Sequence, residues 1–205
     1  GAAAARSGTR LAAILLGMPL GIAPAMILLA TEQSAHFISE SALYAAANVT
    51  GALAVLVGYV VAAGWLNHWF SMLTGVLLWA LVATLLVCFG VSAVGALMAT
   101  VLAFGATHLI VRRIRSEAPR PVSPTWLQLI LRGTIAGLTL TGVVAFAATL
   151  PAGPAGLAAA APIYMLSSMW MLGSLGGRDL VRATFVRADK SMWSYVGFCF
   201  VLYYA

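Results

Sequence analysis

The stretch FSMLTGVLLWALVATLLVCFGVSAVGALMATVLAFGATHLIV, residues 70–111, decides the fold class, because it runs for 42 residues without an Asp, Glu, Lys or Arg. A helix needs roughly 20 apolar residues to cross the hydrocarbon layer of a bilayer. The stretch is therefore about twice as long as one membrane span can use. We expect two membrane helices, 70–89 and 92–111, joined by a tight hairpin turn at residues 90–92.

Similar apolar stretches occur along the rest of the chain. Together they predict seven membrane helices, at residues 11–30, 42–64, 70–89, 92–111, 126–150, 156–175 and about 190–205. Residues 191–205 would reach only about 22 Å as a helix, so the last span should begin inside the preceding charged stretch, or the chain should continue. The expected fold is an all-α polytopic transmembrane bundle. It forms one membrane domain, 1–205, with a first half, 1–111, a basic linker, 112–125, and a second half, 126–205.

The composition also indicates an integral membrane protein. Of the 205 residues, 62% are hydrophobic and 8% are charged, whereas a soluble domain carries roughly 25% charged residues; the mean hydropathy is +1.01. The first ten residues are too short and too weakly hydrophobic for a secretory signal, so we expect the first span to remain as a helix. Cys88 and Cys199 both lie in apolar spans, which favours buried free thiols over a disulfide.

The basic residues gather between alternate spans. Apart from Arg132, which lies a turn or so inside the fifth span, they form three groups: Arg6 and Arg10; Arg112, Arg113, Arg115 and Arg120; Arg178, Arg182, Arg187 and Lys190. The loops on the opposite side contain none, and one of them carries Glu32 and Glu40. Because short loops rich in Arg and Lys stay in the cytoplasm, we expect a bacterial inner (plasma) membrane protein with a cytoplasmic N-terminus.

Four tryptophans should mark the cytoplasmic boundary of the membrane, since Trp is enriched at membrane interfaces. They are Trp65, Trp69, Trp126 and Trp193. The net charge of +6 then indicates contact with the anionic headgroups of membrane lipids and not with nucleic acid.

An internal repeat is indicated by two segments of similar pattern. Each has a Pro-containing apolar helix, a polar linker and a second apolar helix, and placing Pro19 on Pro162 gives an offset of 143 residues. The matched spans, first with sixth and second with seventh, are an odd number of spans apart, so the copies would be inverted. Their linkers, 31–41 and 176–190, are acidic and basic respectively, as expected on opposite sides of a membrane. Inverted repeats of this kind are typical of transporters.

The second copy resembles a known family. Gly176-Gly-Arg-Asp-Leu-Val-Arg-Ala-Thr184, then Ser191-Met-Trp-Ser194 entering an aromatic helix, with Pro162 fifteen residues before Gly177, is similar to the GlpM family of small four-helix inner-membrane proteins. The similarity covers residues 127–205 and, more faintly, 19–87. The chain departs from the family pattern at Leu175, where an acidic residue is common, and by extra residues between Thr184 and Ser191. The resemblance implies that the chain is a fused, duplicated version of a small helical bundle. The biochemical activity of that family is poorly defined.

Two sets of residues could line a substrate path. Pro19 and Pro24 should kink or break the first span, and broken helices expose backbone groups that bind substrates or ions; close helix packing beside glycines explains the same prolines. The deepest polar residues are Asn48, Thr50, Thr139 and Thr141, which either bond neighbouring helices or line a polar path. Gly133 and Gly137, and likewise Gly173 and Gly177, have the Gly-x-x-x-Gly spacing and suggest helix contacts.

The densest charge cluster lies between the sixth and seventh spans. In a helix, the charges would lie on one side and the uncharged residues on the other, as in a segment lying in the headgroup layer. The uncharged side comprises Leu180, Val181, Thr184, Phe185 and Ala188. The basic residues of the cluster, Arg178, Arg182, Arg187 and Lys190, are candidate lipid or anion contacts. One interpretation is a cytoplasmic anchor, with Arg bound to phosphates and to Asp179 or Asp189; the other is a gate or a site for an anionic substrate.

Catalytic and cofactor chemistry has little support in the sequence. It contains no Gly-rich phosphate loop, paired catalytic carboxylates, Ser/His/Asp set or paired Cys motif. His68 and His108 lack partners at ligand spacing, so we expect interfacial histidines and no metal or cofactor. The absence of a charge near the middle of any predicted span also disfavours ion-coupled transport.

Two functions therefore remain. The first is a small permease or flippase-like transporter of a small or amphipathic solute, which is not an enzyme. The second is a non-catalytic structural or assembly subunit that packs against copies of itself or another membrane protein.

Overall fold

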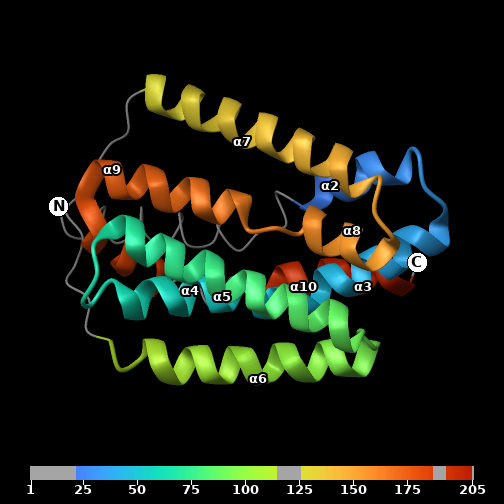
Figure 1. Cartoon of the computed structure of the whole chain (residues 1–205), viewed down its shortest axis with the longest axis horizontal. Coiled ribbons are helices and arrows are strands. Elements are labelled where there is room, and N and C mark those ends of the chain that lie inside the picture. The colour runs from blue at the N-terminus through green and yellow to red at the C-terminus, as the bar shows by residue number, and fades with distance from the viewer. Residues whose placement is uncertain (1–21, 115–125, 187–192, 205) are drawn as a thin grey trace.

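The computed structural model describes residues 22–114, 126–186 and 193–204, and within these ranges every regular element is a helix (Figure 1). The elements are α2 (Ile22–Ala30), α3 (Ala35–Ala47), α4 (Val49–Ala62), α5 (His68–Phe89), α6 (Ala93–Val111), α7 (Trp126–Ala147), α8 (Ala152–Ala159), α9 (Ile163–Phe185) and α10 (Trp193–Tyr204). Since α3 leads into α4 and α8 into α9, the described chain forms seven helices. The all-α fold class is confirmed.

Four helices are long and apolar enough to cross a membrane. They are Ala35–Ala62, His68–Phe89, Ala93–Val111 and Ala152–Phe185. The expectation of a multi-pass helical membrane protein is confirmed at this level. In the other three helices, a shorter apolar stretch, Gly133–Ala147, lies within α7, and α2 and α10 are described over 9 and 12 residues.

The hairpin predicted at residues 90–92 is present. Helix α5 ends at Phe89, and Gly90 takes a φ of 70°, a left-handed conformation that side chains other than glycine rarely adopt. The hydroxyl of Ser92 accepts a hydrogen bond of 3.1 Å from the Gly95 N–H and so caps the start of α6. A glycine turn followed by a serine cap therefore reverses the chain where two spans follow without a charge between them.

The predicted bounds of the second span are wrong. It was expected at residues 42–64 after an acidic linker, 31–41, but α3 already begins at Ala35 and the linker is shortened to residues 31–34. Ser34 caps the helix by accepting a hydrogen bond from the Phe37 N–H. Neither Pro nor Gly interrupts residues 35–47, so the polar residues there, including Glu40, belong to the helix.

The predicted bounds of the sixth span are wrong as well. It was expected at residues 156–175, but the helical segment covers Ala152–Phe185 and changes direction twice. The first change, between α8 and α9, follows from Pro162, which has no N–H and cannot continue a helix without clash. The second lies inside α9, where Gly176 and Gly177 leave helical geometry and Gly177 has a φ of 70°.

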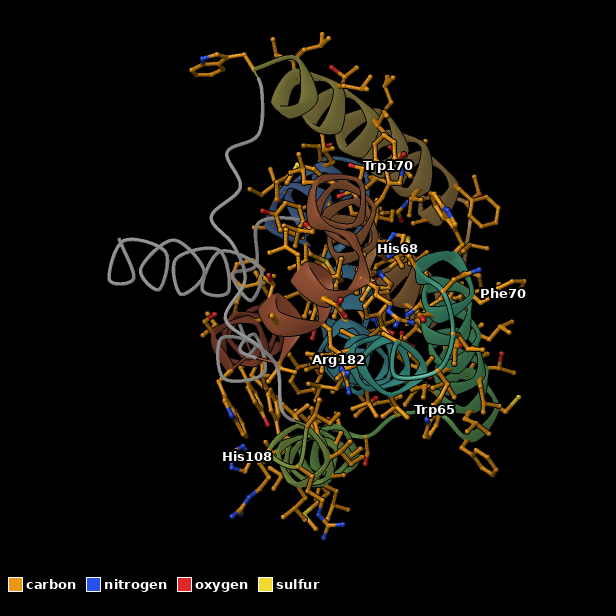
Figure 2. The ribbon with its side chains drawn as sticks, turned by 90° about the vertical axis from the view of Figure 1, so that its left-hand side faces the viewer. Trp65, His68, Phe70, His108, Trp170 and Arg182 are labelled. Atoms are coloured by element: carbon orange, nitrogen blue, oxygen red, sulfur yellow. The ribbon has the colours of Figure 1, made fainter. Side chains whose placement is uncertain are left out.

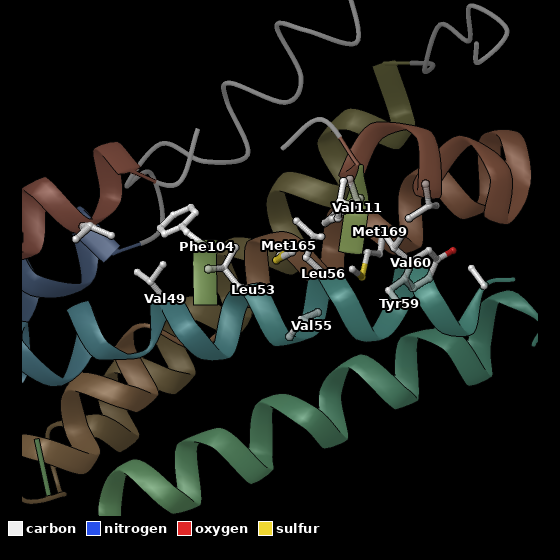
Figure 3. Packing of buried hydrophobic residues seen from close by; sticks show 14 residues of the cluster. Val49, Leu53, Val55, Leu56, Tyr59, Val60, Phe104, Val111, Met165 and Met169 are labelled. Atoms are coloured by element: carbon white, nitrogen blue, oxygen red, sulfur yellow. The ribbon is translucent and has the colours of Figure 1, made fainter. Parts of the chain in front are cut away.

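The α3–α4 helix is the central element of the bundle. Helix α4 packs against α5, α6 and α9, and α3 packs against α8, α10 and α6. Figure 3 shows Leu53, Leu56 and Val60 of α4 beside Met165 and Met169 of α9. The buried core cluster around them comprises Val49, Leu53, Val55, Leu56, Tyr59, Val60, Ala63, Phe104, Val111, Met165, Met169, Val181, Phe185 and Val196.

The described charged residues lie at the two opposite ends of the helical bundle. The α4–α5 turn, the turn after α6 and the final residues of α9 lie at one end of the bundle in Figure 1; the α2–α3, α5–α6 and α7–α8 connections lie at the other. Among the described side chains, the first end has Arg112, Arg113, Arg178, Asp179 and Arg182, and the second has Glu32 and Glu40. We call them the basic end and the acidic end.

Candidate functional site

The α3–α4 helix contacts the α8–α9 helix where the second one is interrupted. Asn48, the residue between α3 and α4, keeps helical geometry. Its side-chain Nδ2 donates a hydrogen bond of 2.8 Å to the carbonyl of Ala160, the C-cap residue of α8, two residues before Pro162. The Oδ1 of Asn48 accepts a hydrogen bond of 3.0 Å from Trp79 Nε1 on α5. Asn48 is 1% exposed. We call Asn48, Trp79 and Ala160 the junction.

The junction gives a protein partner to backbone that would otherwise be unpaired. A helix break frees carbonyl groups, and in a membrane such irregular backbone is tolerated only where protein or a water-filled cavity satisfies it. The side-chain amide of Asn48 satisfies the Ala160 carbonyl here. The junction also connects residues of the first half, Asn48 and Trp79, to one of the second half, Ala160.

Close packing of α3 against α8 holds the junction together. The hydroxyl of Ser41 donates to the Ala152 carbonyl over 2.9 Å. A Cβ on Gly156 would overlap the backbone carbonyl of Ser41, and one on Gly153 would come within 2.8 Å of the Tyr44 ring. Gly156 therefore allows a close approach of backbone, and Gly153 a close approach of the Tyr44 ring, that no larger residue permits.

The other predicted path residues do not join Asn48. Thr50 donates its hydroxyl to the Ala47 carbonyl, one turn back in its own helix segment. Thr139 and Thr141 are exposed on α7 and bond the carbonyls of Ile135 and Gly137 in that helix. Pro24 is exposed on α2. Pro19 lies outside the described residues.

The helix contact expected at Gly133 and Gly137 is not made within the described chain. A Cβ added to either glycine would have no neighbour from another helix within 4 Å.

A short helix closes the basic end. After the bend at Gly176 and Gly177, residues 178–185, which we call the cap helix, continue α9 in a new direction. Its inner side is fully buried, with Val181 and Phe185 in the core cluster and the Phe185 ring centroid 6.4 Å from that of Tyr59. Arg178 and Asp179 are exposed. The amphipathic helix predicted from this sequence is present over the described residues.

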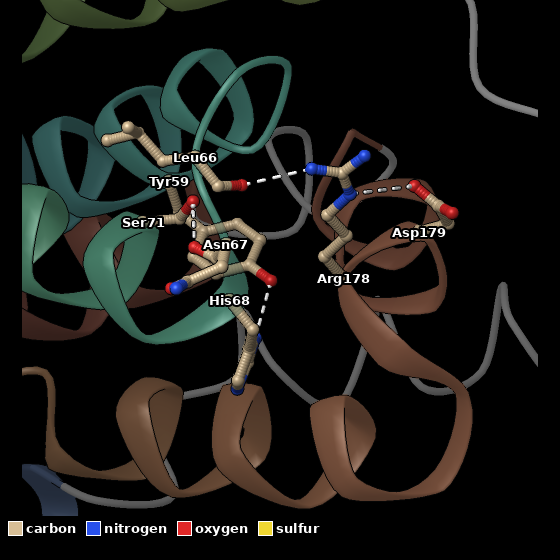
Figure 4. Close-up of polar contacts among 7 residues, drawn as sticks. All are labelled: Tyr59, Leu66, Asn67, His68, Ser71, Arg178 and Asp179. Carbon is tan, nitrogen blue, oxygen red and sulfur yellow. Dashed lines mark hydrogen bonds and ion pairs between the residues drawn. The ribbon is translucent and has the colours of Figure 1, made fainter.

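The two described arginines of the cap helix have different surroundings. Arg178 Nη1 donates a hydrogen bond of 3.1 Å to the Leu66 carbonyl in the α4–α5 turn, and its Nε lies 3.8 Å from Asp179 (Figure 4). Arg182 Nη2 lies 3.9 Å from the position of a Cβ on Gly64, and its Nε is buried without a hydrogen-bond partner among the described residues. Both positive side chains adjoin the carbonyl end of α4, where the helix dipole favours cations. The other two candidate contacts, Arg187 and Lys190, lie outside the described residues.

A tyrosine and a histidine connect α4 and α5 to α9 at the same end. The Tyr59 hydroxyl and His68 Nδ1 are 2.8 Å apart, and Figure 4 shows the two side chains facing each other below the α4–α5 turn. The His68 ring fills the space beside Gly173 of α9, so that a Cβ there would overlap the ring. His68 Nε2 is buried and has no partner among the described residues. Figure 2 places His68 inside the bundle and His108 on its outer side.

Comparison of the chain with protein-family models, with curated proteins and with solved structures gives no match. The resemblance to the GlpM family therefore stays a prediction, and the function must be argued from the residues themselves.

Sequence reasoning missed some of the residues that complete these sites. It selected Asn48 but not its partners, since a tryptophan and an alanine carbonyl give no sequence signal. It also missed Tyr59 and Gly173 beside His68. The Gly-x-x-x-Gly spacing of Gly173 and Gly177 predicts a contact between helices at this place. In the structure, the space beside Gly173 is filled by the imidazole ring of His68. The two cysteines are free, as expected, and Cys199 is buried as predicted. The prediction of a buried thiol is wrong for Cys88, which is exposed because little of α5 is covered by the rest of the protein.

Proposed function

We propose that the protein is a small permease or flippase-like transporter that moves a small or amphipathic solute between its two halves. The observation that supports this best is the junction, where the Asn48 side chain of the first half bonds to the interrupted α8–α9 helix of the second half over 2.8 Å. Transporters form substrate sites at interrupted helices of this kind, where unwound backbone supplies polar groups inside the membrane. The Asn48 amide and the Ala160 carbonyl are the polar groups that the junction offers.

The proposed transport step exchanges partners at the junction. In the closed arrangement, both the Nδ2 and the Oδ1 of Asn48 are bonded to protein. A solute with a hydroxyl, amide or amine group would insert between Asn48 and Ala160 while the halves separate. It would accept from the Asn48 Nδ2 and donate to the Ala160 carbonyl, and the Trp79 bond within the first half would stay in place, so that no polar group is left unpaired. The proposal includes no catalytic step and no cofactor.

Orientation and symmetry belong to the same proposal. The basic end would face the cytoplasm, as the distribution of arginine favours, in a bacterial inner membrane. The inverted repeat at an offset of 143 residues stays a prediction. It is supported by the opposite charge of the segments that it matches, 31–41 and 176–190. It does not pair α3–α4 with α8–α9: these correspond to the second and the sixth span, and they run in the same direction in Figure 1.

Flux measured in liposomes tests the proposal. The purified chain is reconstituted, and the exchange of a fluorescent phospholipid between leaflets and the entry of glycerol are compared with protein-free liposomes. We expect flux of at least one probe, and we expect Asn48→Asp to abolish it, because a charge in the middle of the membrane is strongly disfavoured. Asn67→Asp is the matched control. Asn67 caps α5 through its side-chain oxygen, a role that Asp fills equally well, so flux should persist.

A folded protein without flux for either probe, or equal flux in Asn48→Asp and wild type, contradicts the proposal. The second candidate is then a non-catalytic subunit, and helix α7 favours it: Gly133 and Gly137 meet nothing within 4 Å, and Trp126, Leu127 and Ile130 are exposed. Glycine rows of this spacing pack membrane helices against each other. A second copy or another membrane protein at a fixed ratio after purification in mild detergent would support this candidate.

A further inference from the structure

Exposed aromatic side chains surround the α4–α5 turn at the basic end. Trp65 is 84% exposed, and Trp69 and Phe70 are also well exposed at the start of α5. Figure 2 shows Trp65 and Phe70 on the outer side of this hairpin. Trp rings prefer the boundary between acyl chains and headgroups, where the ring is apolar and its N–H meets polar groups. The turn therefore lies at the depth where lipid phosphates are found.

A fixed guanidinium lies at the same turn. Arg178 Nη1 is held by the carbonyl of Leu66, the residue directly after Trp65, while the side chain remains 45% exposed. Its Nη2 has no partner among the described residues. The nearby acidic group, Asp179, is 3.8 Å from Nε and 87% exposed, a distance and exposure at which an ion pair adds little. The guanidinium is therefore positioned by the backbone and free to bind an anion.

The choice of anion follows from the groups around Arg178. A guanidinium binds phosphate oxygens with two parallel N–H groups, which suits a headgroup better than a point charge does. Four described arginines and one aspartate lie at the basic end, which favours a lipid of net negative charge. The exposed tryptophans would contact the glycerol and upper acyl region, which free phosphate lacks.

We propose that Arg178, together with Trp65 and Trp69, binds the phosphate group of an anionic phospholipid at the basic end. Arg182 is not part of this site, because its Nε is buried and its Nη2 approaches Gly64. The site is independent of transport and would exist equally in a subunit of a larger complex.

Lipid binding to the full chain, measured by native mass spectrometry in detergent, tests the site. Phosphatidylglycerol is titrated and compared with phosphatidylcholine, and we expect the anionic lipid to bind more tightly. Arg178→Gln should weaken phosphatidylglycerol binding about tenfold, the effect expected for one charge-assisted hydrogen bond. Arg113→Gln is the control: Arg113 is exposed at the same end, after α6, so this variant loses the same charge outside the site and should bind nearly as wild type does.

A second pair of variants tests the aromatic contribution without altering charge. Trp69→Ala should weaken phosphatidylglycerol binding, whereas Phe89→Ala should not, because Phe89, although 84% exposed against 62% for Trp69, lies at the acidic end. This pair decides the matter even if Arg178→Gln fails to fold. Excess inorganic phosphate should not displace the lipid, since the tryptophans have no contact with a free anion.

Three results would overturn the site. Equal weakening by Arg113→Gln and Arg178→Gln would mean that total charge alone attracts the lipid. Equal affinity for phosphatidylcholine would exclude selection of an anionic headgroup. Displacement by inorganic phosphate would mean that the site takes a free anion in place of a lipid.

Discussion

The α3–α4 helix and helix α5 lie side by side, yet their environments are opposite. The most apolar stretch of Ala35–Ala62 is 72% buried within the protein, whereas that of His68–Phe89 is 6% buried. The buried helix is the one with more small residues: it has eight alanines and two glycines in 28 residues, and α5 has six leucines, two alanines and one glycine in 22. Lipid is as apolar as leucine, so small residues that permit close approach, and not hydrophobicity, decide which helix becomes central.

The contact between the two helices shows how this works. A Cβ on Gly58 of α4 would lie 2.7 Å from the Leu78 side chain and 3.2 Å from Gly75 of α5, and one on Gly75 would lie 3.0 Å from the Val55 carbonyl. The glycines of both helices thus face each other, and the remaining sides of α5 are left for lipid. The comparison predicts that substitutions at central contacts are costly and that equivalent substitutions on the peripheral helices are not.

The largest effect is expected for Gly156→Ala. The new methyl group would overlap the Ser41 carbonyl, and backbone on both sides must separate, which should lower the free energy of unfolding by about 3 kcal/mol. Gly105→Ala on α6 meets nothing within 4 Å and should be neutral or slightly stabilising, since alanine favours a helix. Denaturation by SDS, followed by circular dichroism, measures both. Equal stability of the two variants would show that α3 and α8 are not tightly packed.

Leu53→Ala and Leu81→Ala compare the same deletion in the two helices. Leu53 of α4 is 1% exposed, whereas Leu81 of α5 is 55% exposed. Truncating Leu53 leaves a cavity and should cost about 2 to 3 kcal/mol, but lipid can fill the space at Leu81, so its loss should cost less than about 0.5 kcal/mol. A thermal unfolding series in one detergent would reveal the difference. Equal costs would mean that α5 is covered by protein.

Asn48→Leu tests the polar contact of the central helix. Leucine has a similar volume but leaves the Ala160 carbonyl and the Trp79 N–H without partners, so a loss of about 2 kcal/mol is expected. Thr139→Val on α7 removes a hydroxyl that bonds only its own helix, and it should change stability by less than about 0.5 kcal/mol. Trp79 fluorescence, isolated by replacing the other tryptophans with phenylalanine, should also shift when its hydrogen bond is lost. An unchanged spectrum would contradict the contact.

The smallest effect is expected for Gly177→Ala. Nothing lies within 4 Å of its Cβ position, so the cost is only that of a positive φ, about 1 kcal/mol. Gly177→Asn should cost about as much, because asparagine tolerates a positive φ in the αL region, whereas ψ is −173° here, a combination that is essentially limited to glycine. If both variants unfold as the wild type does, the cap helix does not depend on this bend.

How far the sequence can predict this molecule depends on the type of interaction. Uncharged stretches and glycine signals correctly predicted the α5–α6 hairpin, and the arginine distribution predicted which connections share an end. The start of α3 at Ala35 was missed because polar residues there were taken for a loop, although the Ser34 cap and the absence of Pro and Gly favoured a helix. Helix ends depend on local capping, which hydropathy does not detect.

The candidate sites could be predicted only in part. Asn48 was singled out because a buried amide must find partners, but the partners themselves, Trp79 and Ala160, come from helices that only tertiary packing brings together. Thr139 and Thr141 were chosen by the same reasoning and instead bond their own helix, as hydroxyls in membrane helices can. Depth along a helix can be read from sequence, but which side of the helix faces the core cannot.

The position of Asn48 halfway along its helix has a mechanical consequence. Ala62 lies 14 residues further on, about 21 Å along a helix. If the α3–α4 helix pivots at the hydrogen bond between Asn48 and Ala160, a tilt of about 10° would move its end at Ala62 by roughly 4 Å, whereas Asn48 itself would hardly move. The protein could thus open at one face while the bond between Asn48 and Ala160 still holds, before a solute inserts between these two groups. This architecture favours rotation of the helix about the Asn48 side-chain amide over sliding of whole helices past one another.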